Sequence, residues 1–120
     1  MDPEVKRALE HDITIDITTR GRKMGQPRRA EMWFHHLDDR IYITGAPGRR
    51  DWLANLIADP EFTFHLKHSA QADLPAKARP IFDQTERRQI LTRLVDRLGG
   101  GRDVEKYVKD SPLIEVDLLD

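Results

Sequence analysis

The sequence predicts a mainly β or α+β fold, in which short strands form an antiparallel sheet that curls towards a barrel. Three observations predict this fold. Apolar and polar residues alternate in several segments, hairpins or short loops join these segments, and only three to four short helices interrupt them. With 120 residues and no cysteine, the chain is expected to form one domain, residues 1–120, without disulfides.

The first part of the chain predicts one helix and three strands. Asp2 is a suitable N-cap, and Pro3 a suitable first residue, for a helix that runs to Glu10. The first strand has isoleucine at every second position, and the hairpin that follows later has a tight Asp38-Asp39 turn. The predicted ranges are 13–18 for the first strand, 19–27 for a loop, and 28–37 and 40–44 for the hairpin.

The middle of the chain predicts a helix and two further strands. Asp51 is expected to cap a helix that ends at the Asp59-Pro60 pair. Phenylalanine and leucine alternate over 62–66 and predict a strand. The segment 72–81 is interrupted by Pro75 and a second proline, so we expect an edge or bulged strand there.

The last part predicts two helices and a final strand. Asp83 followed by Glu86 resembles a capping box for a helix that runs to Leu98, where three glycines end it. A short helix over 104–108 and a strand over 114–118 complete the chain.

Composition excludes several classes of function. The net charge of −1 gives no overall attraction to nucleic acid, and no apolar run is long enough for a transmembrane helix. The N-terminal residues contain an acid and no apolar stretch, so no signal peptide is predicted. Together with the lack of cysteine, this predicts a cytoplasmic protein that neither binds nucleic acid nor inserts into a membrane.

The segment Arg20–Arg29 has the most distinctive charge pattern. It contains five cations and no acid, together with two glycines. Guanidinium forks, a lysine charge and free backbone N–H groups are what a phosphate or carboxylate requires. The segment therefore predicts an anion-binding loop, and the alternative is a flexible, solvated basic loop. The cations are Arg20, Arg22, Lys23, Arg28 and Arg29.

Other candidate residues favour structural interpretations. Trp52 and Asn55 are three residues apart on one helix face, where they could line a pocket, but a core Trp and a surface Asn are the simpler interpretation. Core packing is likewise favoured for Trp33 over a place in a groove. The histidines alternate across strands and diverge, so no metal site is predicted, and no nucleophile has a His/Asp partnership, so no catalytic residue is assigned.

Two spaced motifs resemble a known family. The segment Thr18–Arg28 resembles the pattern T-T-x-G-R-x-[ST]-G-x-x-R, and Trp52–Pro60 resembles W-x-x-N-L-x-x-[ND]-P. Both occur, in the same order and around a hairpin, in the deazaflavin-dependent nitroreductase and quinone reductase family. The resemblance covers roughly residues 12–82. It implies a split β-barrel similar to that of pyridoxamine-phosphate oxidases.

The resemblance also implies a cofactor, a reaction and a site. The cofactor is reduced deazaflavin, coenzyme F-420, which gives a hydride to a quinone, nitroaromatic or other electron-poor acceptor. FMN is the alternative cofactor, and a non-catalytic binder of an anionic metabolite is the alternative function. The implied cofactor-binding residues are those of the loop, Thr19, Arg20, Gly21, Arg22, Lys23, Gly25 and Arg28, and those of the pocket wall, Gly45, Ala46, Pro47, Trp52 and Asn55.

The chain departs from the family pattern at three places. Met24 stands where a small hydroxyl residue is usual, and the loop 45–50 is short. The segment 99–107 corresponds to the tyrosine-rich segment that shapes the acceptor pocket in some members of the family, but here it holds a single tyrosine. Split barrels of this kind commonly pair, and Pro75 marks the predicted edge strand. We therefore expect a homodimer.

Overall fold

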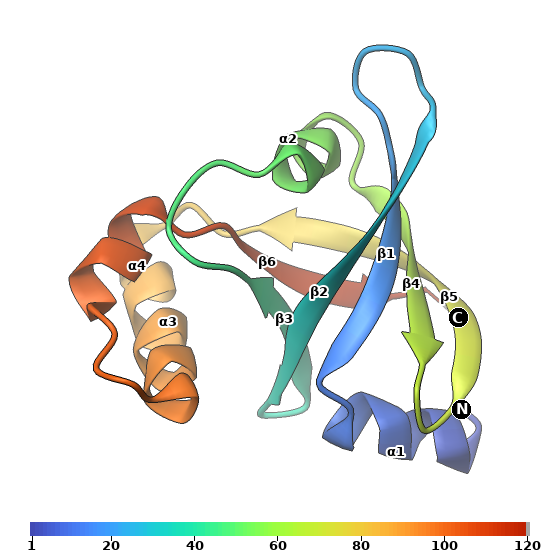
Figure 1. Ribbon diagram of the computed structural model, residues 1–120, viewed down its shortest axis with the longest axis horizontal. Helices are drawn as coiled ribbons and strands as arrows, with labels where there is room; N and C mark the ends of the chain where they lie inside the picture. The colour runs from blue at the N-terminus through green and yellow to red at the C-terminus, as the bar shows by residue number, and fades with distance from the viewer. Residues whose placement is uncertain (120) are drawn as a thin grey trace.

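A computed structural model describes residues 1–119, which form a closed six-stranded barrel and four helices (Figure 1). Around the barrel the strand order is β1-β2-β3-β6-β5-β4, and every neighbouring pair is antiparallel. The predicted fold class and element order are therefore confirmed. The elements are α1 (Pro3–His11), β1 (Thr14–Arg20), β2 (Pro27–Leu37), β3 (Arg40–Thr44), α2 (Asp51–Ala58), β4 (Glu61–Lys67), β5 (Gln71–Pro80), α3 (Gln84–Leu98), α4 (Val104–Asp110) and β6 (Leu113–Leu118).

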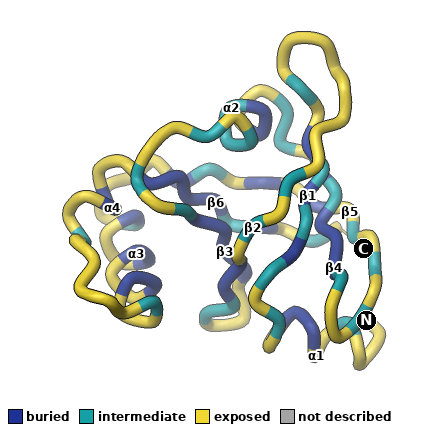
Figure 2. Tube along the Cα trace, in the orientation of Figure 1, coloured by how far each residue is buried: buried dark blue, intermediate teal, exposed yellow. Residues whose placement is uncertain are grey.

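The inner faces of the strands hold the main core. Ile15 and Ile17 of β1 are fully buried, as expected from their alternation, and Phe34 meets Phe64 edge to face with ring centroids 5.4 Å apart. A second apolar cluster lies between the outer face of the barrel and helices α3 and α4, and it includes Tyr42. Core positions are dark blue in Figure 2, whereas most of the connecting loops are yellow.

The structure corrects the prediction for the proline-containing strand. β5 pairs with β4 on one side and with β6 on the other, so it is a central strand of a closed barrel and has no free edge. Pro75 is tolerated because it lies just beyond the last β5–β6 pair, where its carbonyl accepts the N–H of Leu119 at 2.8 Å.

Two of the three predicted helix caps are present. Asp2 accepts the N–H groups of Glu4 and Val5, and Asp83 accepts the N–H of Glu86 at 2.9 Å. The Glu86 side chain binds Arg79 and does not reach back to complete a capping box. Asp51 is not a cap: the N-cap is Arg50, whose side chain makes no capping bond, and Asp51 is the first helical residue.

The β1–β2 hairpin positions the candidate site. β1 extends to Arg20 and β2 begins at Pro27, so the predicted loop 19–27 shortens to 21–26. The hairpin projects beyond the barrel beside α2 (Figure 1), and its tip is exposed (Figure 2). Among residues 1–119, no helix is both long and apolar enough to cross a membrane.

Candidate functional site

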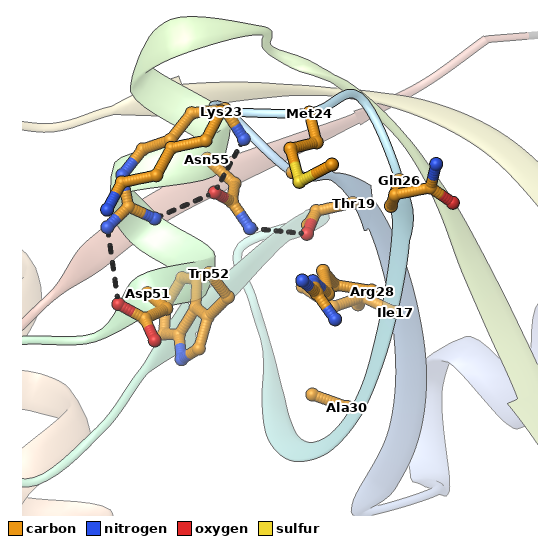
Figure 3. Close-up of a pocket in the computed structure, with 12 residues that line it drawn as sticks. Ile17, Thr19, Lys23, Met24, Gln26, Arg28, Ala30, Asp51, Trp52 and Asn55 are labelled. Carbon is orange, nitrogen blue, oxygen red and sulfur yellow. Dashed lines mark hydrogen bonds and ion pairs between the residues drawn. The ribbon is translucent and has the colours of Figure 1, made fainter.

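A hollow of about 520 Å³ lies between the β1–β2 hairpin and α2 (Figure 3). It brings together most of the residues predicted from the two motifs, although these are about 30 positions apart in the chain. Its lining residues are Ile17, Thr19, Gly21, Arg22, Lys23, Met24, Gln26, Arg28, Ala30, Asp51, Trp52 and Asn55.

The hollow exists because the inner face of the hairpin continues past the end of the core. Ile17 pairs with Ala30 and Thr19 pairs with Arg28, so these side chains share the face that points into the barrel further down. Along this face the residues change from apolar to polar, which gives the hollow a dry floor and a charged rim. Such a surface can hold a ligand with a flat apolar part and an anionic end.

Two glycines shape the tip of the hairpin. The N–H of Gly21 donates to the carbonyl of Gln26 at 2.7 Å, and the N–H of Gly25 donates to the carbonyl of Gly21 at 2.9 Å. A Cβ at Gly21 would lie 3.0 Å from the Gln26 oxygen, and Gly25 has a φ of +69°. Both positions therefore favour glycine in this turn, Gly21 for space and Gly25 for its backbone conformation.

Asn55 fixes the loop to α2. Its Nδ2 donates to Thr19 Oγ1 at 3.2 Å, and its Oδ1 accepts both the backbone N–H (3.2 Å) and the guanidinium (3.0 Å) of Arg22. Asn55 is 3% exposed, so the predicted surface position is wrong. These three hydrogen bonds connect the loop to α2.

The five cations of the basic segment divide into two groups. Arg20 binds Asp59 at 3.0 Å, Arg29 binds Asp16 at 2.9 Å, and Arg22 reaches Asp51 at 3.4 Å. Within residues 1–119, Lys23 and Arg28 have no carboxylate partner, and both line the hollow.

Arg29 belongs to an ion-pair network on the opposite face of the hairpin. Asp16 accepts from Lys67 at 2.8 Å as well as from Arg29, and Lys67 also binds Glu31. The hydrogen bond from Lys67, followed by that from Arg29, lowers the pKa of the Asp16 carboxyl. Arg29 is thus committed to the fold, whereas its neighbour Arg28 is not.

A second hollow, of about 340 Å³, shares Trp52 with the first. Of the predicted wall residues, Gly45 and Ala46 line this second hollow, and Pro47 lines a different one. Trp33 also lines it and is 55% exposed, so the predicted core position of Trp33 is wrong.

The second hollow contains four residues that were not predicted to bind the cofactor, two of them from the segment 99–107. They are Arg50, Arg102, His35 and Tyr107, contributed by a loop, a glycine-rich turn, a strand and a helix. Burial, assisted by the charge of Arg97, lowers the pKa of His35 to about 4, so its ring is neutral at pH 7. In the described part of the chain, no group of three or more His, Asp or Glu side chains is placed to hold a metal ion.

Solved structures place the barrel in a known class. The chain is similar to an F420 reductase (18% identity, 96% of this chain, 93% of that chain, TM-score 0.63). It also resembles the conserved hypothetical protein Rv2991 of Mycobacterium tuberculosis (17% identity, 100% of this chain, 82% of that chain, TM-score 0.74). A Listeria innocua protein assigned as a pyridoxamine 5′-phosphate oxidase shares the fold (12% identity, 92% of this chain, 86% of that chain, TM-score 0.64). The fold is therefore the predicted split β-barrel.

The sequence identifies the family within this class. Residues 2–113 match the family described as F420H(2)-dependent quinone reductase, and the chain belongs to that family. No curated protein matches this chain. Membership confirms the resemblance drawn from the two motifs, and with it a deazaflavin as the cofactor of the family.

Proposed function

We propose that this protein binds reduced coenzyme F-420 in the hollow beneath the β1–β2 hairpin and reduces a quinone, nitroaromatic or other electron-poor acceptor. One observation carries the assignment of the site: Lys23 and Arg28 line a hollow with an apolar floor and, in the described chain, have no carboxylate partner. Unpaired cations above an apolar floor suit a cofactor that has a flat ring and an acidic tail.

Two cations of the hollow, from different parts of the hairpin, fit the acidic tail of such a cofactor. The turn closed by Gly21 and Gln26 presents Lys23 at the rim, and Arg28 enters from the adjacent strand. Arg22, predicted as a direct phosphate ligand, is held by Asn55 and Asp51, so we assign it to positioning the loop. Arg20, which binds Asp59, and Thr19, which accepts from Asn55, hold the base of the same hairpin.

The ring is proposed to lie near Trp52, between the two hollows, with Gly45 and Ala46 beyond it. When bound, the reduced deazaflavin supplies a hydride. The chain's contribution is to orient the ring and to exclude water, through Ile17, Ala30 and the indole of Trp52. No residue of the chain is assigned a covalent step.

The test is a titration with reduced deazaflavin, oxidised deazaflavin and FMN, followed by turnover with a panel of quinones and nitroaromatics. We expect tight binding of the deazaflavin, weaker binding of FMN, and loss of the reduced cofactor's absorbance only when an acceptor is present. NADPH is not expected to serve as donor, since the sequence has no GxGxxG turn. Tighter binding of FMN would favour a flavoprotein, and binding without turnover would favour a non-catalytic carrier.

The two parts of the site are separable by kinetics. Trp52→Ala should lower turnover at saturating cofactor more than Lys23→Ala does, because ring placement affects the transition state whereas saturation hides a binding defect. Lys23→Ala should instead raise the cofactor KM. A fall in turnover for Lys23→Ala as large as that for Trp52→Ala would contradict the division of the site into tail and ring parts.

We further propose that the chain acts as a single domain, in the cytoplasm and as a homodimer. A dimer cannot form through an edge at Pro75, because the barrel is closed. It would have to use another part of the outer surface of the barrel. Sedimentation at micromolar concentration tests this, and a single monomeric species would refute it.

A further inference from the structure

The second hollow combines aromatic walls with uncompensated positive charge. Trp33 and Trp52 line it, as do the guanidinium-bearing residues Arg50 and Arg102. Arg50 donates to the carbonyls of Ala46 (3.0 Å) and Arg49 (2.9 Å), and Arg102 donates to the carbonyls of Gly99 and Leu98. These bonds hold the side chains in place without neutralising them.

No acid in the described chain cancels this charge. Residues 1–119 give neither Arg50 nor Arg102 a carboxylate partner. The one acid that lines the hollow, Glu31, is paired with Lys67 on the outer face of the hairpin. The hollow therefore has an excess of positive charge next to two indole rings.

Two polar side chains in the hollow are also available to a ligand. His35 and Tyr107 are each 9% exposed, and neither side chain has a hydrogen-bond partner within residues 1–119. Yet in that range only the Ser111 hydroxyl is a fully enclosed side-chain polar atom without a partner, so the His35 nitrogens and the Tyr107 hydroxyl remain accessible. Because both lie in the lining, the hollow offers two hydrogen-bonding groups for carbonyl or nitro oxygens.

We propose that the acceptor that enters the second hollow is an aromatic compound bearing a carboxylate or another anionic group. The indoles stack on the ring, Arg50 and Arg102 bind the anionic group, and His35 and Tyr107 face the reducible oxygens. This proposal rests on the proposed function, because it names the acceptor class of that reaction. Bound reduced deazaflavin would supply a hydride (two electrons and one proton), and a second proton from solvent would complete the reduction of a quinone to the hydroquinone.

The test uses two probes that match in shape and differ in charge, anthraquinone-2-carboxylate and anthraquinone-2-carboxamide. The chain's two tryptophans both line the hollow, so quenching of their fluorescence reports binding without turnover. We expect the carboxylate to bind about tenfold tighter than the carboxamide at low salt, with the difference shrinking as ionic strength rises. The titrations are run with and without saturating oxidised deazaflavin, which cannot reduce the probes.

Arginine variants assign the preference to the hollow. Arg102→Gln and, separately, Arg50→Gln should each reduce the preference for the carboxylate severalfold, while binding of the carboxamide stays close to wild type. Arg88→Gln is the matched control, because Arg88 pairs with Glu105 away from the hollow. Arg50 is the N-cap residue of α2, so its substitution could change the local loop structure. The separate variant at Arg102 tests the same prediction without that change.

The outcomes separate this proposal from the cofactor assignment. Equal affinity for the two probes, or binding of neither while deazaflavin still binds, overturns the anionic-acceptor proposal and leaves the cofactor site standing. A carboxylate preference lost in the arginine variants supports it. The same preference in a protein that binds no deazaflavin supports the anion-selective hollow and overturns the proposed function.

Discussion

Arg87 on α3 and the cations of the β1–β2 hairpin are the same kind of group in opposite surroundings. Arg87 is 7% exposed and donates to four backbone carbonyls, at 2.6 to 3.3 Å, where α3, α4 and β6 meet. Burial lowers the pKa of its guanidinium, which still finds an acceptor on every nitrogen. Lys23 and Arg28 line a hollow and, in the described chain, bind no carboxylate.

Structural and functional charges differ in the acceptors that the chain offers them. A cation whose donors are all used by the chain contributes to the stability of the fold. A cation without an intramolecular acceptor, at the rim of a concave surface, is available to a ligand. Substitutions should accordingly change the free energy of unfolding in the first group and ligand affinity in the second.

The largest expected effect is on Arg87. Arg87→Met removes the donors to four buried carbonyls, so the free energy of unfolding should fall by about 3 kcal/mol or more. Urea denaturation measures this, and ligand affinity should be unchanged in the fraction that folds. Arg88→Met is the control, since that side chain pairs with Glu105 at the surface and should change stability little. A loss no greater than that of the control would remove Arg87 from the structural group.

His35 provides a comparison within the buried polar groups, because its ring has no partner in the described chain. Its pKa is near 6.5 when unfolded and about 4 when folded, owing first to burial and then to Arg97. A lowered folded pKa means that His35 stabilises the fold above pH 6.5 and that this contribution disappears as the pH falls towards 4. The loss should be about 3 kcal/mol.

The comparison is between wild type and His35→Gln, with the free energy of unfolding measured from pH 7 to pH 4. The variant should show a shallower decline. The two proteins differ only at position 35, so the other charged or titratable groups near the ring are the same in both. These groups are Arg97 on α3, Tyr42 on β3, Tyr107 on α4, and Arg50 and Arg102 at the second hollow. Parallel profiles would show that the imidazole is not held neutral.

The barrel strands can be predicted from the sequence because the signals for them are local. Alternating isoleucines, the Asp38-Asp39 turn and the Asp2 and Asp83 caps each act within a few residues, and all are present in the structure. Closure of the barrel is not local. It depends on β5 pairing with β6, which is why two prolines suggested an edge strand where none exists.

The same distinction applies to the candidate site. The motifs predicted the first hollow, but they gave no means to distinguish Arg28 from Arg29, because the partner of Arg29 lies on a neighbouring strand. The second hollow was predicted only in part, through Gly45, Ala46, Trp52 and the tyrosine of the segment 99–107. Trp33, His35 and the two arginines were missed, because these parts of the chain meet only after α3 and α4 pack on the outer face of the barrel. Arginines beside glycines, at 48–50 and 100–102, were the available signal.

Lys23 and Arg28 provide the next prediction. The double variant Lys23→Ala/Arg28→Ala should weaken deazaflavin binding more than tenfold, because each charged hydrogen bond contributes about 1.5–3 kcal/mol. The melting temperature should stay near the wild-type value, since neither residue has an ion-pair partner within residues 1–119. Arg29→Ala is the matched control and should leave affinity nearly unchanged. An unaltered dissociation constant in the double variant would make the loop an ordinary solvated surface.

Asn55 connects the two groups, because this buried polar side chain bonds within the chain and holds the loop that carries the unpaired Lys23. Asn55→Ala removes the bonds to Thr19 and Arg22, and we expect a loss of about 1 kcal/mol in stability and a severalfold rise in the deazaflavin dissociation constant. The affinity falls although Asn55 bears no charge, since a looser loop must be ordered when the ligand binds. Hydrogen exchange over residues 21–26 should accelerate.

Thr19→Val removes only the bond to the hydroxyl, so it should affect the loop less than Asn55→Ala does. If exchange over the loop is unchanged in Asn55→Ala while affinity falls, Asn55 binds the cofactor directly and does not position the loop.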